Sequence, residues 1–175
     1  MGNEERELPN IIICGTPGTG KTTLAEQVAE TTELENICIG DVVKENHLHF
    51  GFDEKWKTYD VDEDKVLDYL EPKLLKGGCI IDWHTCGLFS EELIDLVVVL
   101  RTDHSKLWER LESRGYSLEK IQENNEAEIM QICLEEARES FDPKIVVELP
   151  SESIEEMESN LSRITQWVTN WKKNH

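Results

Sequence analysis

The sequence predicts an α/β fold, in which a five-stranded parallel sheet is covered by helices on both faces as one three-layer domain over residues 1–175. Short runs that are apolar throughout alternate with longer segments whose apolar residues recur every three or four positions. Strands without a polar side are typical of parallel sheets buried between helices. The length of 175 residues and the hydrophobic content of 38% suit a single domain of this kind.

The first half of the chain supplies three predicted strands and three predicted helices. The strands are the apolar runs at residues 10–14, 37–39 and 79–82. The helices are the segments at residues 22–32, 41–47 and 62–76. Asp41 has a side chain suited to capping the second helix, and Gly77-Gly78 is suited to ending the third. Residues 50–61 mix aromatic and polar side chains without a clear period, which predicts a loop.

The second half supplies two further strands and three helices. The strands are the apolar runs at residues 96–100 and 145–147. The helices are the segments at residues 105–114, 118–141 and 154–171. Ile129 and Met130 fall in phase with the apolar face of the long helix predicted at 118–141. A capping-box pattern at Ser153 predicts the start of the last helix, whose apolar stripe begins at Ile154.

The charge balance excludes some classes of function. With 18 basic and 37 acidic residues the formal net charge is −19, so broad binding to nucleic acid or to anionic lipid is not expected. No apolar run is long enough to span a membrane. Residues 119–160 hold 13 acidic and 3 basic side chains, which fits either a solvated surface or a docking surface for a basic protein. Five scattered cysteines indicate reduced thiols in an intracellular protein.

Residues 15–22 read Gly-Thr-Pro-Gly-Thr-Gly-Lys-Thr and match the pattern G-x-x-x-x-G-K-[ST]; we call this segment the phosphate loop. It leaves a predicted strand and enters a predicted helix, which is the context that phosphate binding requires. Glycines let backbone N–H groups converge on a phosphate oxygen, the helix adds its positive dipole end, and the lysine brings a full charge. The predicted ATP-binding residues of this segment are Gly18, Thr19, Gly20, Lys21, Thr22 and Thr23.

A carboxylate on a neighbouring strand is needed to complete a Mg²⁺ site at such a loop. Thr22 supplies a hydroxyl oxygen, and Asp82 is expected at the carboxyl end of its strand, the edge where ligands bind in parallel sheets. Asp95 precedes its strand and is expected at the opposite edge. His84 is a candidate to orient a water molecule or accept a proton, and equally a structural histidine that bonds the loop.

Six segments of the chain carry a resemblance to a known family. They are GTPGTGKTT (15–23), IGDVVKEN (39–46), DEDKVLDYLEP (62–72), GGCIIDWHTC (77–86), VVVLRTD (97–103) and LWERLESRGYSLEKIQENNEAEI (107–129). They are similar to the nuclear adenylate kinase isoenzyme six family, also described as the coilin-interacting nuclear ATPase family. Asp-x-His at 82–84 and Arg-Gly-Tyr at 114–116 are its more distinctive marks.

The resemblance implies a P-loop fold of the adenylate-kinase type, with a monophosphate-binding segment at residues 38–61 and a short lid at residues 113–123. It implies phosphoryl transfer from ATP to AMP and slow ATP hydrolysis, both with Mg²⁺. It also implies a role in maturation of the small ribosomal subunit through a basic small-subunit ribosomal protein. A location in the nucleus as well as the cytoplasm rests on the resemblance alone, and we expect a monomer.

The resemblance also implies roles for individual residues. Those expected to carry catalysis are Lys21, Asp82, His84 and Arg114. Arg114 would close from the lid over the transferred phosphoryl group, and Arg110 lies four positions earlier on the same helix face. Asp41 and Lys44 would shape the acceptor site. Lys44 stands where the family often has arginine, so a point charge replaces a bidentate grip on the monophosphate.

Two functions stay open on the sequence. The first is a nucleoside monophosphate kinase. The second is an ATP-hydrolysing switch protein in ribosome assembly with little kinase activity, which the acidic stretch at 119–160 and His84 favour. His47 and His49 lack a third ligand at a familiar spacing and are interpreted as surface histidines.

Overall fold

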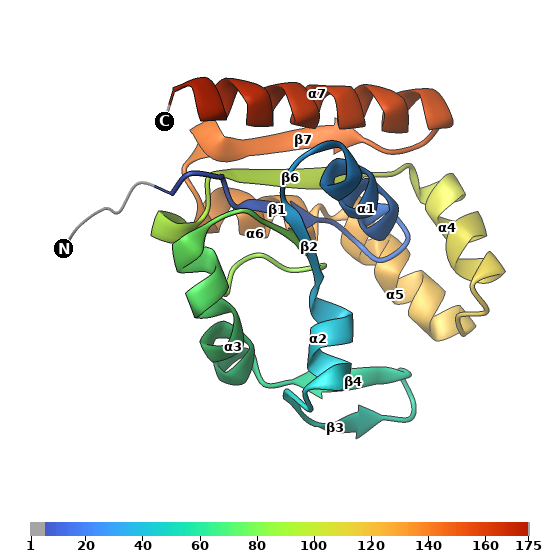
Figure 1. Cartoon of the computed structure of the whole chain (residues 1–175). Coiled ribbons are helices and arrows are strands. Elements are labelled where there is room, and N and C mark those ends of the chain that lie inside the picture. Colours follow the sequence, from blue (N-terminus) through green and yellow to red (C-terminus); the bar gives the residue numbers. More distant parts are fainter. Residues whose placement is uncertain (1–5, 175) are drawn as a thin grey trace.

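The computed structural model describes residues 6–174 and shows a parallel sheet between two layers of helices, with a separate hairpin below it (Figure 1). The five strands of the sheet lie in the order β2-β5-β1-β6-β7. Their bounds are Ile11–Cys14 for β1, Glu35–Cys38 for β2, Cys79–Asp82 for β5, Leu96–Arg101 for β6 and Val146–Pro150 for β7. Every pair of neighbours is parallel. The predicted α/β class with its five-stranded parallel sheet is confirmed.

The described part of the chain forms seven α-helices, six between strands and one, α7, after the last strand. Their bounds are Lys21–Thr31 for α1, Ile39–Glu45 for α2, Glu63–Lys76 for α3, His104–Ser113 for α4, Leu118–Ile129 for α5, Ile132–Ser140 for α6 and Ile154–Lys173 for α7. Two short 3₁₀ turns, at Glu91–Leu93 and Pro143–Ile145, precede β6 and β7. None of the helices between residues 6 and 174 combines the length and the apolar composition needed to cross a lipid bilayer.

The side chains of each central strand divide between two cores, one on each face of the sheet. Ile11 and Ile13 of β1 are buried with residues of α1 and α7. Ile12 and Cys14 are buried with residues of α2, α3 and α6. Because successive side chains of a strand point to opposite faces, a run that is apolar throughout is what a sheet covered on both faces requires.

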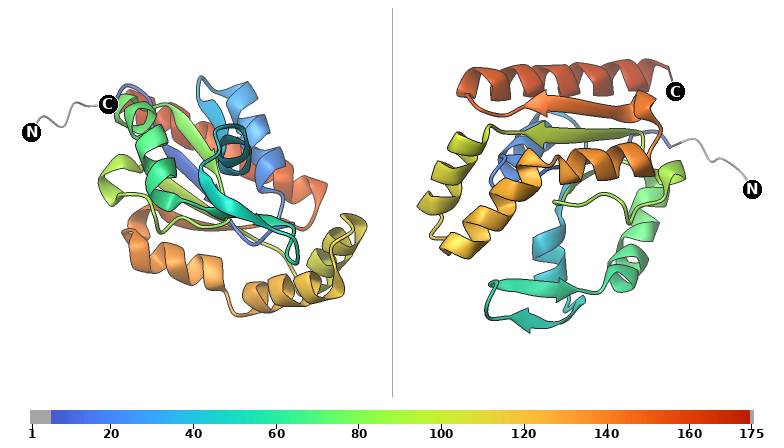
Figure 2. Two further views of the ribbon diagram at one scale, coloured as in Figure 1. Left: turned by 90° about the horizontal axis from the view of Figure 1, so that it is seen from below. Right: turned by 180° about the vertical axis from the view of Figure 1, so that it is seen from behind.

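The loop prediction for residues 50–61 is wrong, because the chain forms an antiparallel hairpin there. β3 (His49–Asp53) pairs with β4 (Thr58–Val61), and we call residues 49–61 the hairpin. The register shifts between His49 and Gly51, which interrupts the alternation that would have marked the strand. The hairpin is joined to the sheet by α2 on one side and α3 on the other (Figure 2, right).

The prediction of one helix over 118–141 is also wrong. Gln131 adopts a left-handed conformation with φ of 59° and ψ of 36°, and it separates α5 from α6. Ile129 and Met130, predicted to lie on the apolar face, are 63% and 59% exposed at this break. The break is favoured because the change of direction lets α6 bury Leu134 under the sheet while α5 extends away beside α4.

The start of α2 differs from the expectation, whereas the start of α7 agrees with it. α2 begins at Ile39, and Asp41 therefore lies in its first turn instead of capping it. α7 begins as predicted, with the Ser153 hydroxyl accepting a hydrogen bond from the N–H of Glu156 at 3.1 Å. Ile154 is 76% exposed, so the buried stripe of α7 starts further along the helix, where Ile164 and Val168 pack against the sheet.

Candidate functional site

The phosphate loop joins β1 to α1 through a turn that admits only glycine at two positions. Gly15 has a φ of 152°, and a Cβ there would lie 2.9 Å from the carbonyl oxygen of Leu100. Gly18 has a φ of 95°, and a Cβ there would lie 2.8 Å from Cδ1 of Leu107. α1 begins at Lys21 directly after the turn, which places its positive dipole end at the loop. The local backbone is that of an anion-binding site.

Side chains from distant segments hold this loop in shape. The Ser151 hydroxyl, after β7, donates to the carbonyl oxygen of Thr19 at 2.5 Å. Arg110 of α4 donates through Nη1 to the carbonyl oxygen of Gly18 at 3.2 Å. Within the loop, the Thr19 hydroxyl donates to the carbonyl oxygen of Thr16 at 2.8 Å. The loop is therefore fixed by side chains around it as well as by its own turn.

Lys21 places its ammonium group inside the loop. Its Nζ donates to the carbonyl oxygen of Thr16 at 3.4 Å. Burial lowers the pKa of Lys21, and the nearby Asp82 carboxylate offsets part of that shift. A buried cation gains more from a bound anion than an exposed one does, so the site is suited to a polyphosphate.

Thr22 and Asp82, predicted to form the two halves of a metal site, are in direct contact. β5 lies beside β1 with Asp82 opposite Ile13, and the Thr22 hydroxyl donates to Oδ2 of Asp82 at 2.6 Å. Asp82 is buried at 3% exposure. Asp95 lies at the other end of the sheet, where it pairs with Arg6 at 2.6 Å. The structure thus brings together the pair expected from the sequence.

The residues at this point fit a magnesium ion. Hydroxyl and carboxylate oxygens are ligands that Mg²⁺ accepts, and it completes its shell with phosphate oxygens and water. Within residues 6–174 no group of three or more His, Cys, Asp or Glu side chains is arranged to hold a metal ion. A metal at Thr22 and Asp82 would therefore depend on a bound nucleotide for its other ligands.

His84 follows Asp82 on the loop after β5. Its ring contacts that of Trp83 in a tilted arrangement, with centroids 4.2 Å apart. His84 is an exposed residue, although neighbouring protein atoms shield part of it from water. This burial, together with the positive charge of Lys21, lowers the pKa of His84 to about 4, although Glu136 acts in the opposite direction. The imidazole is neutral at pH 7 and is able to accept a hydrogen bond or a proton.

Glu136 of α6 holds the loop that carries His84, a role that sequence analysis missed. Its Oε1 accepts hydrogen bonds from the Thr85 hydroxyl and from the N–H groups of Cys86 and Gly87, the latter two at 2.8 Å each. Partial burial alone would raise the pKa of Glu136, but these three donors outweigh it and lower the pKa. The two segments are about 50 positions apart in the chain, so no local sequence pattern marks the contact.

Glu128 of α5 is a second site residue that sequence analysis missed. It is 2% exposed. Its Oε1 accepts from the Thr16 hydroxyl at 3.0 Å, and its Oε2 accepts from the N–H of Thr102 at 2.7 Å and from Nε of Arg101 at 3.2 Å. The acidic stretch at 119–160 is therefore not only a solvated or docking surface, because Glu128 and Glu136 use their carboxylates for hydrogen bonds inside the protein.

A cavity of about 550 Å³ opens beside the phosphate loop. It is lined by Gly18, Gly20, Thr23, Glu109, Arg110, Ser113, Arg114, Ser151 and Met157. Arg114 lies on its rim at the end of α4, next to Gly115, which has a φ of 77° and open space around it. Arg114, predicted to close over the transferred phosphoryl group, and Arg110 of the same helix face both line this cavity. Arg110 is bonded to the loop, and Arg114 is exposed.

The expected acceptor residues lie on the other side of the site. Asp41 and Lys44 are exposed on α2, in its first and last turn, and their roles stay predictions. The His49 and Tyr59 rings are in tilted contact within the hairpin, with centroids 4.5 Å apart. The predicted lid, residues 113–123, forms the turn from α4 into α5.

Comparison with known proteins bears on this arrangement. The family model described as an AAA domain matches residues 11–131. The chain is 50% identical over 169 residues to an adenylate kinase isoenzyme 6 homolog of Dictyostelium discoideum, covering 97% of each chain. It is 48% identical over 174 residues to the Caenorhabditis elegans homolog, covering 98% of this chain and 96% of the other.

Solved structures share the fold at low identity. Shikimate kinase from Acinetobacter baumannii, in complex with shikimate, superimposes with a TM-score of 0.63 at 16% identity, covering 93% of this chain and 94% of the other. Shikimate kinase from Bacteroides thetaiotaomicron gives 0.62 at 14% identity, covering 93% and 99%. The phosphate loop and the Asp-x-His segment at 82–84 are the motifs that carried the resemblance. The Dictyostelium and Caenorhabditis relatives align with this chain over nearly its full length, and the chain belongs to the adenylate kinase isoenzyme 6 family.

Proposed function

We propose that this protein is a nucleoside monophosphate kinase that transfers the γ-phosphoryl group of ATP to AMP, with slower hydrolysis of ATP as a side reaction. The observation that carries the proposal is the contact of Thr22 with buried Asp82 at 2.6 Å beside Lys21. This is the arrangement that P-loop enzymes use to hold a nucleoside triphosphate with its metal. The names of the relatives support an adenylate kinase in particular.

The chain's own residues supply binding, orientation and charge. Backbone N–H groups of the phosphate loop and the ammonium of Lys21 would bind the β- and γ-phosphates. Thr22 and Asp82 would hold Mg²⁺, which when bound neutralises charge on the phosphate oxygens. Arg114 would stabilise the negative charge on the transferred group by closing about the hinge at Gly115.

The acceptor would enter from the side of α2 and the hairpin. Lys44 would attract the monophosphate as a point charge, and Asp41 would shape the same pocket. His84, neutral at pH 7 because its pKa is about 4, would accept a hydrogen bond from the acceptor or from a water molecule. The same imidazole therefore serves transfer and hydrolysis, and the two reactions compete at one site.

Incubation of the pure protein with ADP and Mg²⁺ tests the proposal. The expected result is formation of ATP and AMP in equal amounts, since the reaction is reversible and uses two ADP molecules. Lys21→Met should abolish it while the fold, measured by circular dichroism, is kept. ADP that remains unchanged, with ATP slowly hydrolysed in a parallel assay, would contradict the kinase and leave the switch protein.

The second candidate function is an ATP-hydrolysing factor in assembly of the small ribosomal subunit. It is favoured by exposed apolar residues among acidic ones at the break between α5 and α6, namely Ile129, Met130 and Ile132. Such a surface suits a basic protein partner. The test is whether a basic small-subunit ribosomal protein raises ATP turnover. Nuclear as well as cytoplasmic location belongs to this proposal and is checked by imaging of the tagged protein; a monomer is checked by light scattering.

A further inference from the structure

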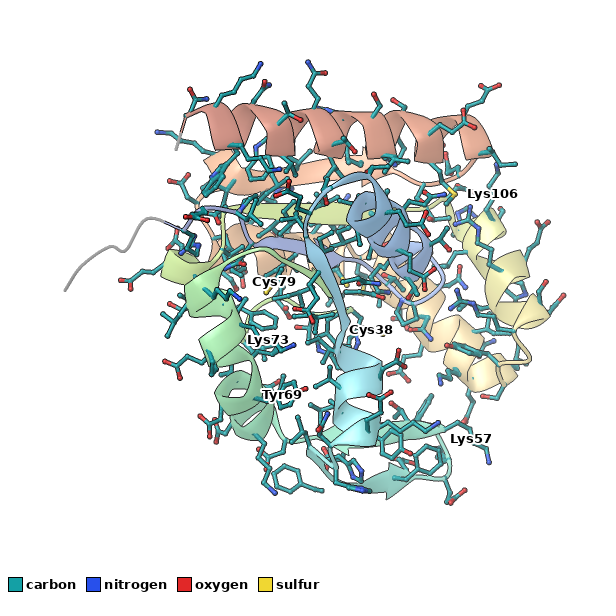
Figure 3. All side chains as sticks on the ribbon, in the orientation of Figure 1. Cys38, Lys57, Tyr69, Lys73, Cys79 and Lys106 are labelled. Carbon is teal, nitrogen blue, oxygen red and sulfur yellow. The ribbon has the colours of Figure 1, made fainter. Side chains whose placement is uncertain are left out.

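The lid and the hairpin touch each other directly. Lys120, in the first turn of α5, donates through Nζ to the backbone carbonyl oxygen of Trp56 at 2.8 Å. Trp56 lies in the turn between β3 and β4, 64 positions earlier in the chain. Figure 3 labels Lys57 at this turn, close to the lower end of α5. The Lys120 side chain therefore connects the lid to the hairpin by a direct hydrogen bond.

Lys120 is held ready for this contact on the lid side. The Ser117 hydroxyl accepts from its backbone N–H at 3.3 Å, which fixes the start of α5. The ammonium group lies 4.2 Å from the centre of the Tyr116 ring, a favourable cation–π geometry. Tyr116 in turn packs on the small core of Leu107, Leu111 and Ile121. The direction of the lysine is thus set by the lid itself.

On the hairpin side, a turn orders the backbone next to the Trp56 carbonyl oxygen that accepts from Lys120. Oδ1 of Asp53 accepts hydrogen bonds from the N–H groups of Lys55 and Trp56, at 2.9 and 3.1 Å. This local turn orders the backbone as far as the N–H of Trp56, directly before the accepting carbonyl group. A second contact between the segments, Lys55 to Glu119 at 3.8 Å, joins two exposed side chains and is expected to contribute little.

The contact matters because of what each segment carries. The lid carries Arg114, two residues before Tyr116, and the hairpin continues from α2 with Lys44. We propose that Lys120 is a specificity-determining residue, an inference that rests on the proposed function. By holding the lid against the hairpin, Lys120 favours the monophosphate over water as the acceptor. Closure of the lid against the hairpin excludes bulk water from the reacting phosphoryl group.

Removal of the ammonium should shift the balance between the two acceptors. Transfer to a monophosphate needs the lid and the hairpin in contact, whereas water reaches the triphosphate whenever the two segments separate. We expect Lys120→Met to raise the ratio of inorganic phosphate released to phosphoryl groups transferred about three- to tenfold, the effect of losing one partly exposed charged hydrogen bond. Lys120→Arg keeps a donor and the contact with Tyr116 and should restore a ratio near that of the wild type.

Lys106→Met is the matched control. Lys106 of α4 also donates to a backbone carbonyl oxygen, that of Glu152, at 2.9 Å, but it lies away from the hairpin (Figure 3). The assay measures inorganic phosphate and ADP together in the presence of ATP, AMP and Mg²⁺. An unchanged ratio in Lys120→Met, or an equal change in Lys106→Met, would overturn the role of Lys120.

Hydrogen exchange without nucleotide separates this proposal from the proposed function. Lys120→Met should speed exchange of the backbone amides of residues 54–58, and Lys106→Met should not. Faster exchange with an unchanged product ratio would overturn the specificity role alone. A wild-type protein that forms no ATP from ADP would overturn the proposed function, and the specificity role with it. Equal thermal unfolding of all variants establishes that each is folded.

Discussion

The phosphate loop and the hairpin are held in opposite ways. In the loop, Thr16, Gly18 and Thr19 each bond a residue from another element, and the glycines fit against buried leucines. In the hairpin, Phe50 is 73% exposed and Phe52 44% exposed. The hairpin is held mainly by the pairing of β3 with β4, and it makes few contacts with the rest of the molecule. We therefore expect the side of the phosphate loop, on which the proposed function places the triphosphate, to be rigid, and the side of the hairpin, on which it places the acceptor, to be mobile.

This difference has a physical basis in what each side must do. A loop that binds a polyphosphate through backbone amides gains most when those amides are already in place. A segment that admits and releases a second substrate has to open, and regions with few buried contacts open at low cost. The predictions below test this contrast, first on the rigid side and then on the mobile side.

The largest effect is expected at Asp82. Asp82→Asn keeps the size of the side chain and can still bond the Thr22 hydroxyl, but it removes the charge that would bind Mg²⁺. We expect kcat to fall about a thousandfold, or about 4 kcal/mol of transition-state stabilisation, with little change in thermal unfolding. Steady-state kinetics over a range of Mg²⁺ concentrations measures it. A loss of less than tenfold would place the metal elsewhere.

The next effect concerns the support of the loop by Glu128. Glu128→Ala leaves Arg101 without its buried partner and the Thr16 hydroxyl and Thr102 N–H without an acceptor. The free energy of unfolding should fall by about 3 kcal/mol, as measured by urea denaturation. Glu126→Ala, at an exposed position of the same helix, should change it by less than about 0.5 kcal/mol. Equal losses in the two variants would mean that the buried contacts do not stabilise the loop.

The features that the sequence predicts are those set by local patterns, and the features it does not predict depend on contacts between distant residues. The phosphate loop, the five strands and the meeting of Thr22 with Asp82 follow from local patterns and from the geometry of parallel sheets. Glu128 and Glu136 do not, because each bonds residues far away in the chain and resembles its exposed acidic neighbours. The hairpin was missed because the shift near Gly51 breaks the period of its strand.

A smaller effect, dependent on pH, is expected at Glu136. Its three donors lower the pKa of the carboxyl group in the folded state, so its stabilising contribution is complete above the unfolded pKa of about 4.3 and is lost as the pH falls through the folded value. Glu136→Gln should cost about 1 kcal/mol at pH 7, and the difference from the wild type should shrink below about pH 4. Thermal unfolding over pH 3 to 7 measures both, with exposed Glu135→Gln as the control.

The smallest effect is expected on the mobile side, at Lys44. Because α2 leaves this side chain exposed, exchanging it should not disturb the fold, and only its grip on a bound monophosphate should change. A guanidinium bonds a phosphate through two parallel N–H groups, whereas an ammonium acts as a point charge. Lys44→Arg should therefore lower the KM for AMP about two- to fivefold, or about 0.5–1 kcal/mol, and leave the KM for ATP unchanged. If both KM values change together, the mobile side does not bind the acceptor separately from the rigid side, and the division of the site proposed here fails.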